Sequence, residues 1–227
     1  MGVTDRYRSQ SDLPTALPIF PLRGAVLLPR ASLTLNVFEP RYLALVDAAL
    51  AGSRLIGVVQ PSPDSGLAES PIGKNFPLRR VGCAGRITSF TESEDGRMTI
   101  SLAGVARFVL GNDVETEEPF RICAVDFAPY ARDFMPGHGE DDVDRPRLIA
   151  TLRSYLQANG LNADWERING ASTERLVNAL AILSPYGPEE KQCLLEAGDL
   201  RARADALVAL AEMELAARDD GSGTSLQ

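Results

Sequence analysis

The hydrophobic pattern of this chain changes its period once, and that change constrains the fold more than any other feature. Up to about residue 127 apolar residues alternate with polar ones, as at Leu33, Leu35 and Val37, which is typical of strands with one wet face. Beyond about residue 143 they recur every three or four residues, as on an amphipathic helix. Strands followed by helices predict an α+β protein with a β lobe over 14–127, a linker over 128–142 and a helical lobe over 143–217.

A strand, a rigid corner and a helix follow one another between residues 32 and 52. The alternation over 32–37 predicts the strand, and Phe38-Glu39-Pro40 turns the corner. Pro40 suits the first helical position because its fixed φ fits there and its missing N–H would have no partner. Gly52 stands where a helix-ending glycine is expected. We therefore expect a helix over 41–51, covering one open end of the β lobe.

Residues 81–110 have the pattern of a β-hairpin. Two alternating runs flank Glu94-Asp95-Gly96, and Asp-Gly at this place predicts a type I′ turn. Gly104 interrupts the alternation of the second run, which indicates a bulge or the bend of a barrel corner. Further strands are expected over 55–60 and 120–127, and the segment 17–22 is expected to insert into the β lobe.

The helical half contains four apolar stripes at helical spacing, over 148–156, 176–183, 188–198 and 200–215. Asp199 is placed to cap the last of these helices. The polar ends, 1–13 and 218–227, are expected to be flexible tails. The long segment 61–80 is rich in proline and glycine, and its apolar residues either pack into the core or form an exposed contact.

Charge and composition narrow the possible functions. The net charge is −8, and most of it falls in residues 128–227, which hold 10 basic and 17 acidic residues. No basic patch favours nucleic acid or an anionic membrane, so we expect neither partner. The start shows no secretory signal and no apolar run is long enough to cross a membrane, which predicts a cytoplasmic protein. Three widely spaced cysteines fit buried thiols in a reducing compartment.

Short sequence landmarks occur in both halves of the chain. They are Leu17-Pro18-Ile19-Phe20-Pro21-Leu22-Arg23, Leu28-Pro29, Phe38-Glu39-Pro40-Arg41-Tyr42, Val81-Gly82, Gly85-Arg86-Ile87, Asp95-Gly96-Arg97, Gly104 with Arg107-Phe108, Glu189-Glu190-Lys191-Gln192, Leu194-Leu195-Glu196 and Asp199-Leu200-Arg201. With these landmarks in order, residues 14–218 resemble the Lon N-terminal domain family, the substrate-recognition domain of an ATP-dependent protease.

The resemblance implies a PUA-like β pseudobarrel followed by a C-terminal α-helical lobe. It also implies a non-catalytic module that binds unfolded or client polypeptides, with a protease-system partner as a further possibility. Such a module could serve as an adaptor or a holdase in proteolysis or quality control. The alternative is a small-molecule-binding or enzymatic protein that uses a pocket between the two lobes.

The chain shows no catalytic, metal-binding or cofactor-binding motif. Gly73-Lys74 is its only Gly-Lys pair, and Asn75 follows it where a phosphate-binding loop needs Ser or Thr. The ATPase module and the Ser-Lys dyad of full-length Lon are not found in these residues. His138 lies in a Gly- and Pro-rich segment without a nucleophile motif, and the acidic cluster at 140–144 lacks the pattern of a calcium loop. We therefore expect no enzyme activity, no cofactor and no metal.

Candidate protein-binding residues lie at the strand–helix corner and in the long loop. The competing interpretation, which we favour for each residue, is structural: Phe38 and Tyr42 would pack the corner into the core, and Glu39 and Arg41 would form local ion pairs. Clients would bind the β lobe, because it is nearly neutral and has strand edges to offer. The candidates are Arg23, Phe38, Glu39, Arg41, Tyr42, Phe76 and Leu78.

Overall fold

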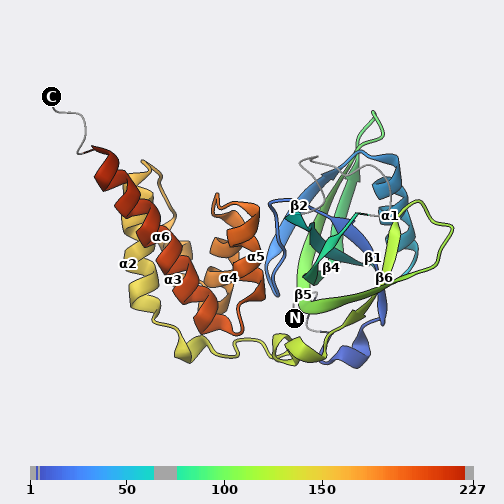
Figure 1. The fold of residues 1–227 in the computed structure, drawn as a ribbon, viewed down its shortest axis with the longest axis horizontal. Helices are drawn as coiled ribbons and strands as arrows, with labels where there is room; N and C mark the ends of the chain where they lie inside the picture. The colour runs from blue at the N-terminus through green and yellow to red at the C-terminus, as the bar shows by residue number, and fades with distance from the viewer. Residues whose placement is uncertain (1–3, 5, 64–75, 223–227) are drawn as a thin grey trace.

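The computed structural model describes residues 4, 6–63 and 76–222, with side chains through Arg218, as a β-barrel beside a group of helices (Figure 1). The strands are β1 (Ala16–Pro21), β2 (Ser32–Val37), β3 (Leu55–Pro61), β4 (Leu78–Glu92), β5 (Met98–Val114) and β6 (Arg121–Asp126). The helices are α1 (Pro40–Ala51), α2 (Arg145–Ala158), α3 (Trp165–Gly170), α4 (Thr173–Leu183), α5 (Pro188–Glu196) and α6 (Leu200–Ser222), with short 3-10 helices η1 (Gln10–Asp12), η3 (Ala128–Phe134) and η4 (Glu140–Asp142).

The strands close into a barrel because β6, the last strand of the row, also bonds to β5. The order is β2-β5-β4-β3-β1-β6, and β6 pairs with β5 as well as with β1. Only β1 and β3 run parallel, and the remaining pairs are antiparallel. β2 lies outside the closed ring, on the edge of β5. The α+β class is confirmed, and residues 17–21 of the segment expected to insert into the β lobe belong to the barrel strand β1.

The predicted hairpin is confirmed, but the predicted type I′ turn is wrong. β4 and β5 pair along most of their length, and the register shifts opposite Gly104, between Ala84 and Gly85, as a bulge requires. In the turn the Gly96 N–H donates to the Ser93 carbonyl at 2.9 Å. Gly96 has φ +77°, whereas Asp95 does not have positive φ. The loop is therefore built on a type I arrangement followed by a left-handed glycine, since a type I′ turn needs positive φ at both central residues.

Two hydrophobic clusters form the core. One fills the barrel, where Leu17, Ile19 and Phe108 are at most 1% exposed. The other runs continuously from α1 across β2 to the helices, so that Val46 of α1 and Leu194 of α5 belong to the same cluster. Burial of apolar surface therefore joins the barrel to the helical lobe, by which we mean α2–α6.

Buried polar side chains also join the two halves. Arg107 of β5 and Asp133 of η3 form an ion pair at 2.8 Å, and both are under 10% exposed. Arg107 also donates to the carbonyl of Ala197 at 2.6 Å, beyond the end of α5. The residues between β6 and α2 thus fold into η3 and η4, with Asp133 tied to the barrel. The division into two lobes around a 128–142 linker stays a prediction.

The flexible tails over 1–13 and 218–227 stay a prediction, and some residues that the structure describes within them pack on the core or continue a helix. Tyr7 and Leu13 are 6% and 7% exposed and pack on the barrel core. The Tyr7 hydroxyl accepts a hydrogen bond from Arg86 at 3.0 Å. At the other end α6 continues as helix to Ser222, past the predicted boundary at Arg218. Asp199 caps α6 as expected, accepting from the Ala202 N–H at 2.7 Å.

The cysteines follow the prediction in two of three cases. Cys83 and Cys123 are buried, whereas Cys193 on α5 is exposed. Burial raises the pKa of the Cys83 thiol, and burial together with the Asp113 carboxylate raises the pKa of Cys123 to about 12. Both buried thiols are therefore protonated and act as small apolar side chains.

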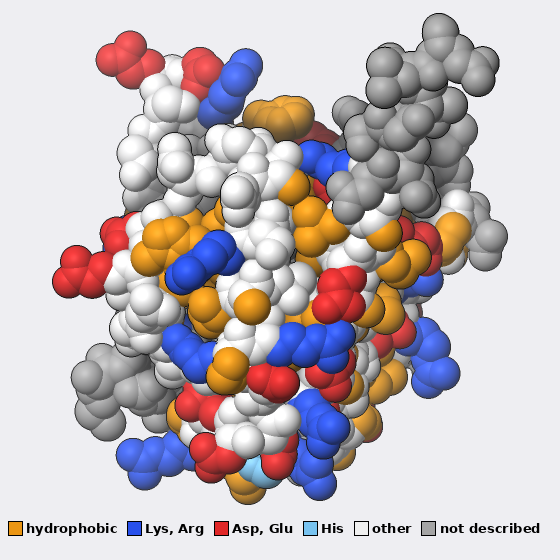
Figure 2. Space-filling model, turned by 90° about the vertical axis from the view of Figure 1, so that its left-hand side faces the viewer, with side chains coloured by type: hydrophobic (Ala, Val, Ile, Leu, Met, Phe, Trp, Pro, Cys, Tyr) orange, Lys and Arg blue, Asp and Glu red, His pale blue; other side chains and the backbone are white. Residues whose placement is uncertain are grey.

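The outer face of the helical lobe is mixed in character. Figure 2 shows Lys and Arg side chains interspersed with Asp and Glu, and apolar patches between them. The excess of acidic residues in this half of the sequence therefore does not produce one uniformly acidic surface on this face. No helix within the described residues is both long and apolar enough to cross a membrane.

Candidate functional site: a groove beside strand β2

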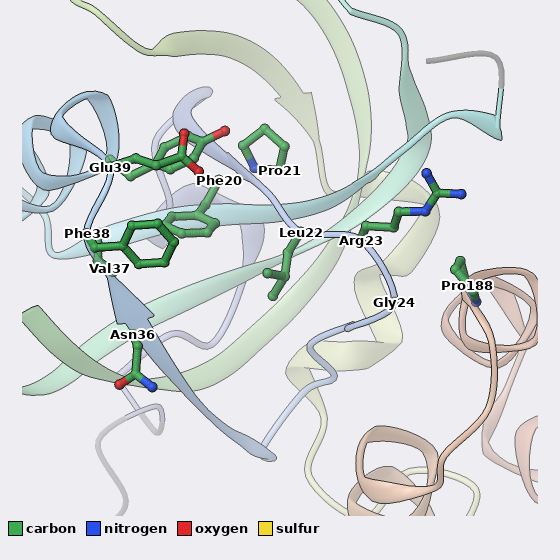
Figure 3. Close-up of a pocket in the computed structure, with 11 residues that line it drawn as sticks. Phe20, Pro21, Leu22, Arg23, Gly24, Asn36, Val37, Phe38, Glu39 and Pro188 are labelled. Atoms are coloured by element: carbon green, nitrogen blue, oxygen red, sulfur yellow. The ribbon is translucent and has the colours of Figure 1, made fainter. Parts of the chain in front are cut away.

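A groove with a volume of about 760 Å³ lies between the end of β2, the start of α1 and the connection that follows β1 (Figure 3). Three segments that are distant in sequence form it, and Pro188 of α5 closes one end. Its lining combines apolar side chains with a few polar ones: Phe20, Pro21, Leu22, Arg23, Gly24, Asn36, Val37, Phe38, Glu39, Tyr42 and Pro188.

Aromatic rings supply the floor and the rim of the groove. Tyr42, in the first turn of α1, stacks on Phe20 of β1 with ring centroids 4.6 Å apart, and both rings are buried. Phe38 follows Val37, whose side chain points inward, so the alternation of the strand turns Phe38 outward. Its ring is 64% exposed. An exposed aromatic ring beside a partly apolar groove is typical of a surface that binds a protein or peptide.

Charged groups at the corner lie over this aromatic floor. Arg41 pairs with Glu39 at 2.8 Å, and its guanidinium lies 4.5 Å from the centroid of the Tyr42 ring. Burial raises the pKa of Tyr42, so its hydroxyl stays protonated at neutral pH. The corner is therefore held by an ion pair and a cation–π contact, each a modest contribution at a partly exposed site.

β2 also offers an open edge next to the groove. Within the described residues, β2 hydrogen-bonds to β5 alone. The Gly104 N–H donates to the Ala31 carbonyl at 2.9 Å, and hydrogen-bonded pairs alternate along an antiparallel ladder. The bonded pairs are then those of Leu33, Leu35 and Val37. The backbone N–H and C=O groups of Thr34 and Asn36 consequently point away from β5, where an added strand could bind them.

The structure brings together four of the seven sequence-predicted binding residues. Arg23, Phe38, Glu39 and Tyr42 line the groove, and Arg41 lies beside it in the ion pair with Glu39. The structural interpretation holds for the buried Tyr42 and for the Glu39–Arg41 pair. For Phe38 it is wrong, because a ring that is 64% exposed does not pack the corner into the core.

Phe76 and Leu78 lie elsewhere. Phe76 is only 9% exposed, beneath the guanidinium of Arg121, which lies 5.9 Å from the ring centroid and donates to the Phe76 carbonyl at 2.8 Å. Leu78 begins β4 and packs on the barrel cluster. Of the long loop, residues 64–75 lie outside the described residues. The described end of the loop therefore presents Phe76 to the core and not to solvent.

Sequence reasoning missed the remaining residues of the groove, which are Phe20, Pro21, Leu22, Gly24, Asn36, Val37 and Pro188. Asn36 could have been found, since it is the last outward-facing polar residue of the predicted strand. Pro188 had no local signal, because it enters the groove only through the packing of α5 against the barrel.

A second cleft, with a volume of about 630 Å³, lies between the barrel and the helical lobe. Three of its charged residues, Arg30, Glu140 and Glu174, are connected by hydrogen bonds. Glu174 receives hydrogen bonds from Arg30 and, at 2.9 Å, from the Gly137 N–H, while Glu140 accepts from the Glu174 N–H at 2.8 Å. Both carboxylates therefore already accept hydrogen bonds from the protein. The lining is Thr4, Arg30, Ser32, Thr88, Ala103, Pro136, Gly137, Glu140, Ser172, Glu174 and Arg175.

No metal site emerges from the part of the chain that the structure describes. A search of those residues for three or more His, Cys, Asp or Glu side chains able to hold one ion finds no such group. The geometry thus favours the groove beside β2 as the candidate site, and its lining suits it to binding.

Comparisons with curated proteins point to one family. The chain is 28% identical over 211 residues to Lon protease of Desulfosudis oleivorans, which covers 89% of this chain and 24% of that protein. It is 31% identical over 207 residues to Lon protease of Parabacteroides distasonis, which covers 87% and 24%. The chain therefore spans about a quarter of the length of these relatives.

Solved structures share the fold. The crystal structure of a Lon N-terminal domain protein from Xanthomonas campestris matches with a TM-score of 0.59 and 26% identity, covering 86% of this chain and 98% of that one. The N-terminal domain of Lon protease from the Mycobacterium avium complex matches with a TM-score of 0.64 and 18% identity, covering 87% and 98%, and shows the fold alone.

The family model described as "ATP-dependent protease La (LON) substrate-binding domain" matches residues 16–212, which include the barrel, the groove and most of the helical lobe. The match takes in both halves of the structure in one continuous segment. This chain belongs to the Lon substrate-binding domain family.

Proposed function

We propose that this chain is a non-catalytic protein-binding module that holds an extended segment of an unfolded client polypeptide in the groove beside β2. The observation that carries the proposal is the exposed Phe38 ring on a largely apolar groove, next to an open strand edge, in a member of a substrate-binding family. A client strand could hydrogen-bond to the edge of β2 while its side chains enter the groove. Unfolded chains expose both backbone groups and apolar side chains, so this arrangement suits them.

The same geometry supports a role as an adaptor or a holdase in proteolysis or quality control, with a protease-system partner. The relatives are named Lon protease, and the chain corresponds to about a quarter of their length. A module of this kind would bind the client, and a partner would act on it.

The alternative, a small-molecule or enzymatic site between the lobes, has less support. The cleft that it would use holds Arg30, Glu140 and Glu174 in mutual contacts.

The first test compares two exposed phenylalanines. Phe38 lies on the groove, whereas Phe90 of β4 is 50% exposed and lies outside it. We expect Phe38→Ala to weaken binding of fluorescein-labelled β-casein, a soluble protein without stable folded structure, by about tenfold, the equivalent of ~1.4 kcal/mol. Phe90→Ala should bind as the wild type does, and both variants should melt within about 2 °C of it because neither ring is buried. Equal affinity in all three proteins would contradict the proposal.

The second test addresses the strand edge. Thr34→Pro removes an N–H that points away from β5, so the β2–β5 ladder keeps its bonds and proline is tolerated at such an edge position. We expect weaker casein binding with little loss of stability. If Thr34→Pro binds casein as the wild type does while Phe38→Ala loses affinity, clients bind in the groove without adding a strand to β2.

A further inference from the structure

The side-chain amide of Gln60, at the end of β3, connects one wall of the groove to the helical lobe. Gln60 is 2% exposed. Its Oε1 accepts from the Gly24 N–H at 2.9 Å, and its Nε2 donates to the Pro188 carbonyl at 2.9 Å and to Gln192 Oε1 at 3.0 Å. Both amide donors and the amide oxygen are therefore used, the donors on α5 and the oxygen on the connection that follows β1.

Two of these partners line the groove, although Gln60 itself does not. Gly24 and Pro188 face the groove at the end opposite Phe38 (Figure 3). Gly24 has φ +70°, and a Cβ built on it would lie 4.0 Å from Pro188 Cγ. The wall at this end is thus a left-handed glycine that lies near the first residue of α5, with room between them for a methyl group. The amide of Gln60 hydrogen-bonds to both residues.

α5 is in turn seated on the barrel by polar contacts of its own. Gln192 donates to the Val81 carbonyl of β4 at 3.2 Å, and Arg79 of β4 forms an ion pair with Glu189. Gln192 is also 2% exposed. A displacement of α5 would therefore move Pro188 at the groove and pull on the amide that holds Gly24.

We propose that Gln60 is a positioning residue for the client groove, and that it couples the seating of α5 on the barrel to client binding. The proposal rests on the proposed function and adds a route by which the helical lobe controls the groove. A groove held in its binding form avoids the cost of ordering the wall when the client arrives. Because coupling is reciprocal, a bound client also stabilises the seated position of α5.

A purely structural role would affect stability alone, and Asn178 of α4 provides the matched control. It is 1% exposed, and its Nδ2 donates to the Pro29 carbonyl at 2.9 Å, so it too joins the β1–β2 connection to the helical lobe. It does not line the groove. Its Oδ1 accepts from Arg203 at 2.9 Å, so Asn178→Leu should lose at least as much stability as Gln60→Leu.

The experiment measures the Kd of the full chain for fluorescein-labelled β-casein at 15 °C, after circular dichroism has established that each variant is folded there. We expect Gln60→Leu to raise the Kd about fivefold or more, in the usual range for coupling between sites, and Asn178→Leu to stay within about twofold of the wild type. If both variants change the Kd in proportion to their loss of stability, or if Gln60→Leu binds as the wild type does, the positioning role is wrong.

Hydrogen exchange on the wild type keeps the proposal testable even if Gln60→Leu does not fold. Casein should slow amide exchange in residues 188–196 as well as in residues 22–24. If saturating casein leaves the rate of amide exchange in α5 unchanged, the proposed coupling is wrong. If Phe38→Ala binds casein as the wild type does, the proposed function itself is refuted. If Phe38→Ala loses affinity for casein and Gln60→Leu does not, only the coupling is refuted.

Discussion

Replacing Gly104 with alanine should destabilise the protein strongly, although the backbone there is not left-handed. A Cβ added at Gly104 would lie 1.9 Å from the Leu28 carbonyl oxygen and 2.7 Å from its carbonyl carbon. These are backbone atoms, so no rotamer change can relieve the clash. The segment that carries Leu27 and Leu28, both fully buried, must move away by more than ~1 Å to restore van der Waals contact.

Two hydrogen bonds resist that movement. The Gly104 N–H donates to Ala31 and the Arg30 N–H donates to the Gly104 carbonyl, each at 2.9 Å. Overpacking a core costs about 1–3 kcal/mol, and each of these bonds contributes about 1 kcal/mol. We therefore expect Gly104→Ala to lower the free energy of unfolding by roughly 3–5 kcal/mol, a large share of the ~5–15 kcal/mol of a typical domain.

Urea denaturation followed by circular dichroism would measure the effect. Gly198→Ala is the control, because a Cβ at Gly198 meets nothing within 4 Å and its φ is not left-handed. It should change stability by no more than about 0.5 kcal/mol. A Gly104→Ala variant as stable as Gly198→Ala would show that the β1–β2 connection can shift freely, and the reasoning from close approach would fail.

Three further predictions concern the buried ion pair, the loop end and catalysis. Asp133→Asn leaves the guanidinium of Arg107 buried without its counter-charge and should cost about 3–5 kcal/mol in urea denaturation, so a loss below about 1 kcal/mol would contradict the role of the pair. Phe76→Ser should lower stability by about 3 kcal/mol because the ring is buried, and an unchanged melting temperature would show that it is not. Purified protein should hydrolyse neither ATP nor β-casein, and turnover that co-purifies with the chain through several columns would overturn the non-catalytic assignment.

Much of the fold could be predicted because local patterns and local physics agree. Pro40 begins α1 and β2 ends at Val37, as the corner predicts. The break in alternation at Gly104 marks a true bulge. The turn type was missed because Asp-Gly suits two kinds of hairpin loop, and only the backbone angle of Asp95 separates them. The last turns of α6 were missed because a helix can continue through polar residues beyond the end of its buried apolar face.

The candidate site was less predictable because the exposure of a side chain depends on whether a distant part of the chain packs on it. Phe38 stands in an apolar segment, and the sequence cannot show that no later element packs on it. Phe76 is the opposite case, a loop residue that Arg121 covers from a distant strand. Long-range packing brings Pro188 to the groove and to Gln60, which lies 128 positions away in the chain. Such neighbours carry no local periodicity from which to infer them.

The connection between β1 and β2 explains why the groove depends on both halves of the molecule. Gly24 is held by Gln60, Pro29 by Asn178, and Arg30 by Glu174 of α4 and by the Asp133 carbonyl at 2.6 Å. Arg30 has φ +59°, a backbone conformation that costs a non-glycine residue about 1–2 kcal/mol. It persists because its guanidinium and its N–H are fixed by contacts on three elements. Neither Pro29 nor Arg30 lines the groove. The groove wall at Gly24, which Gln60 connects to Pro188 and Gln192 of α5, needs no ordering when a client binds, and the barrel without α5 would lack these partners. The helical lobe therefore contributes to binding through the wall it holds, even though only Pro188 of that lobe lines the groove.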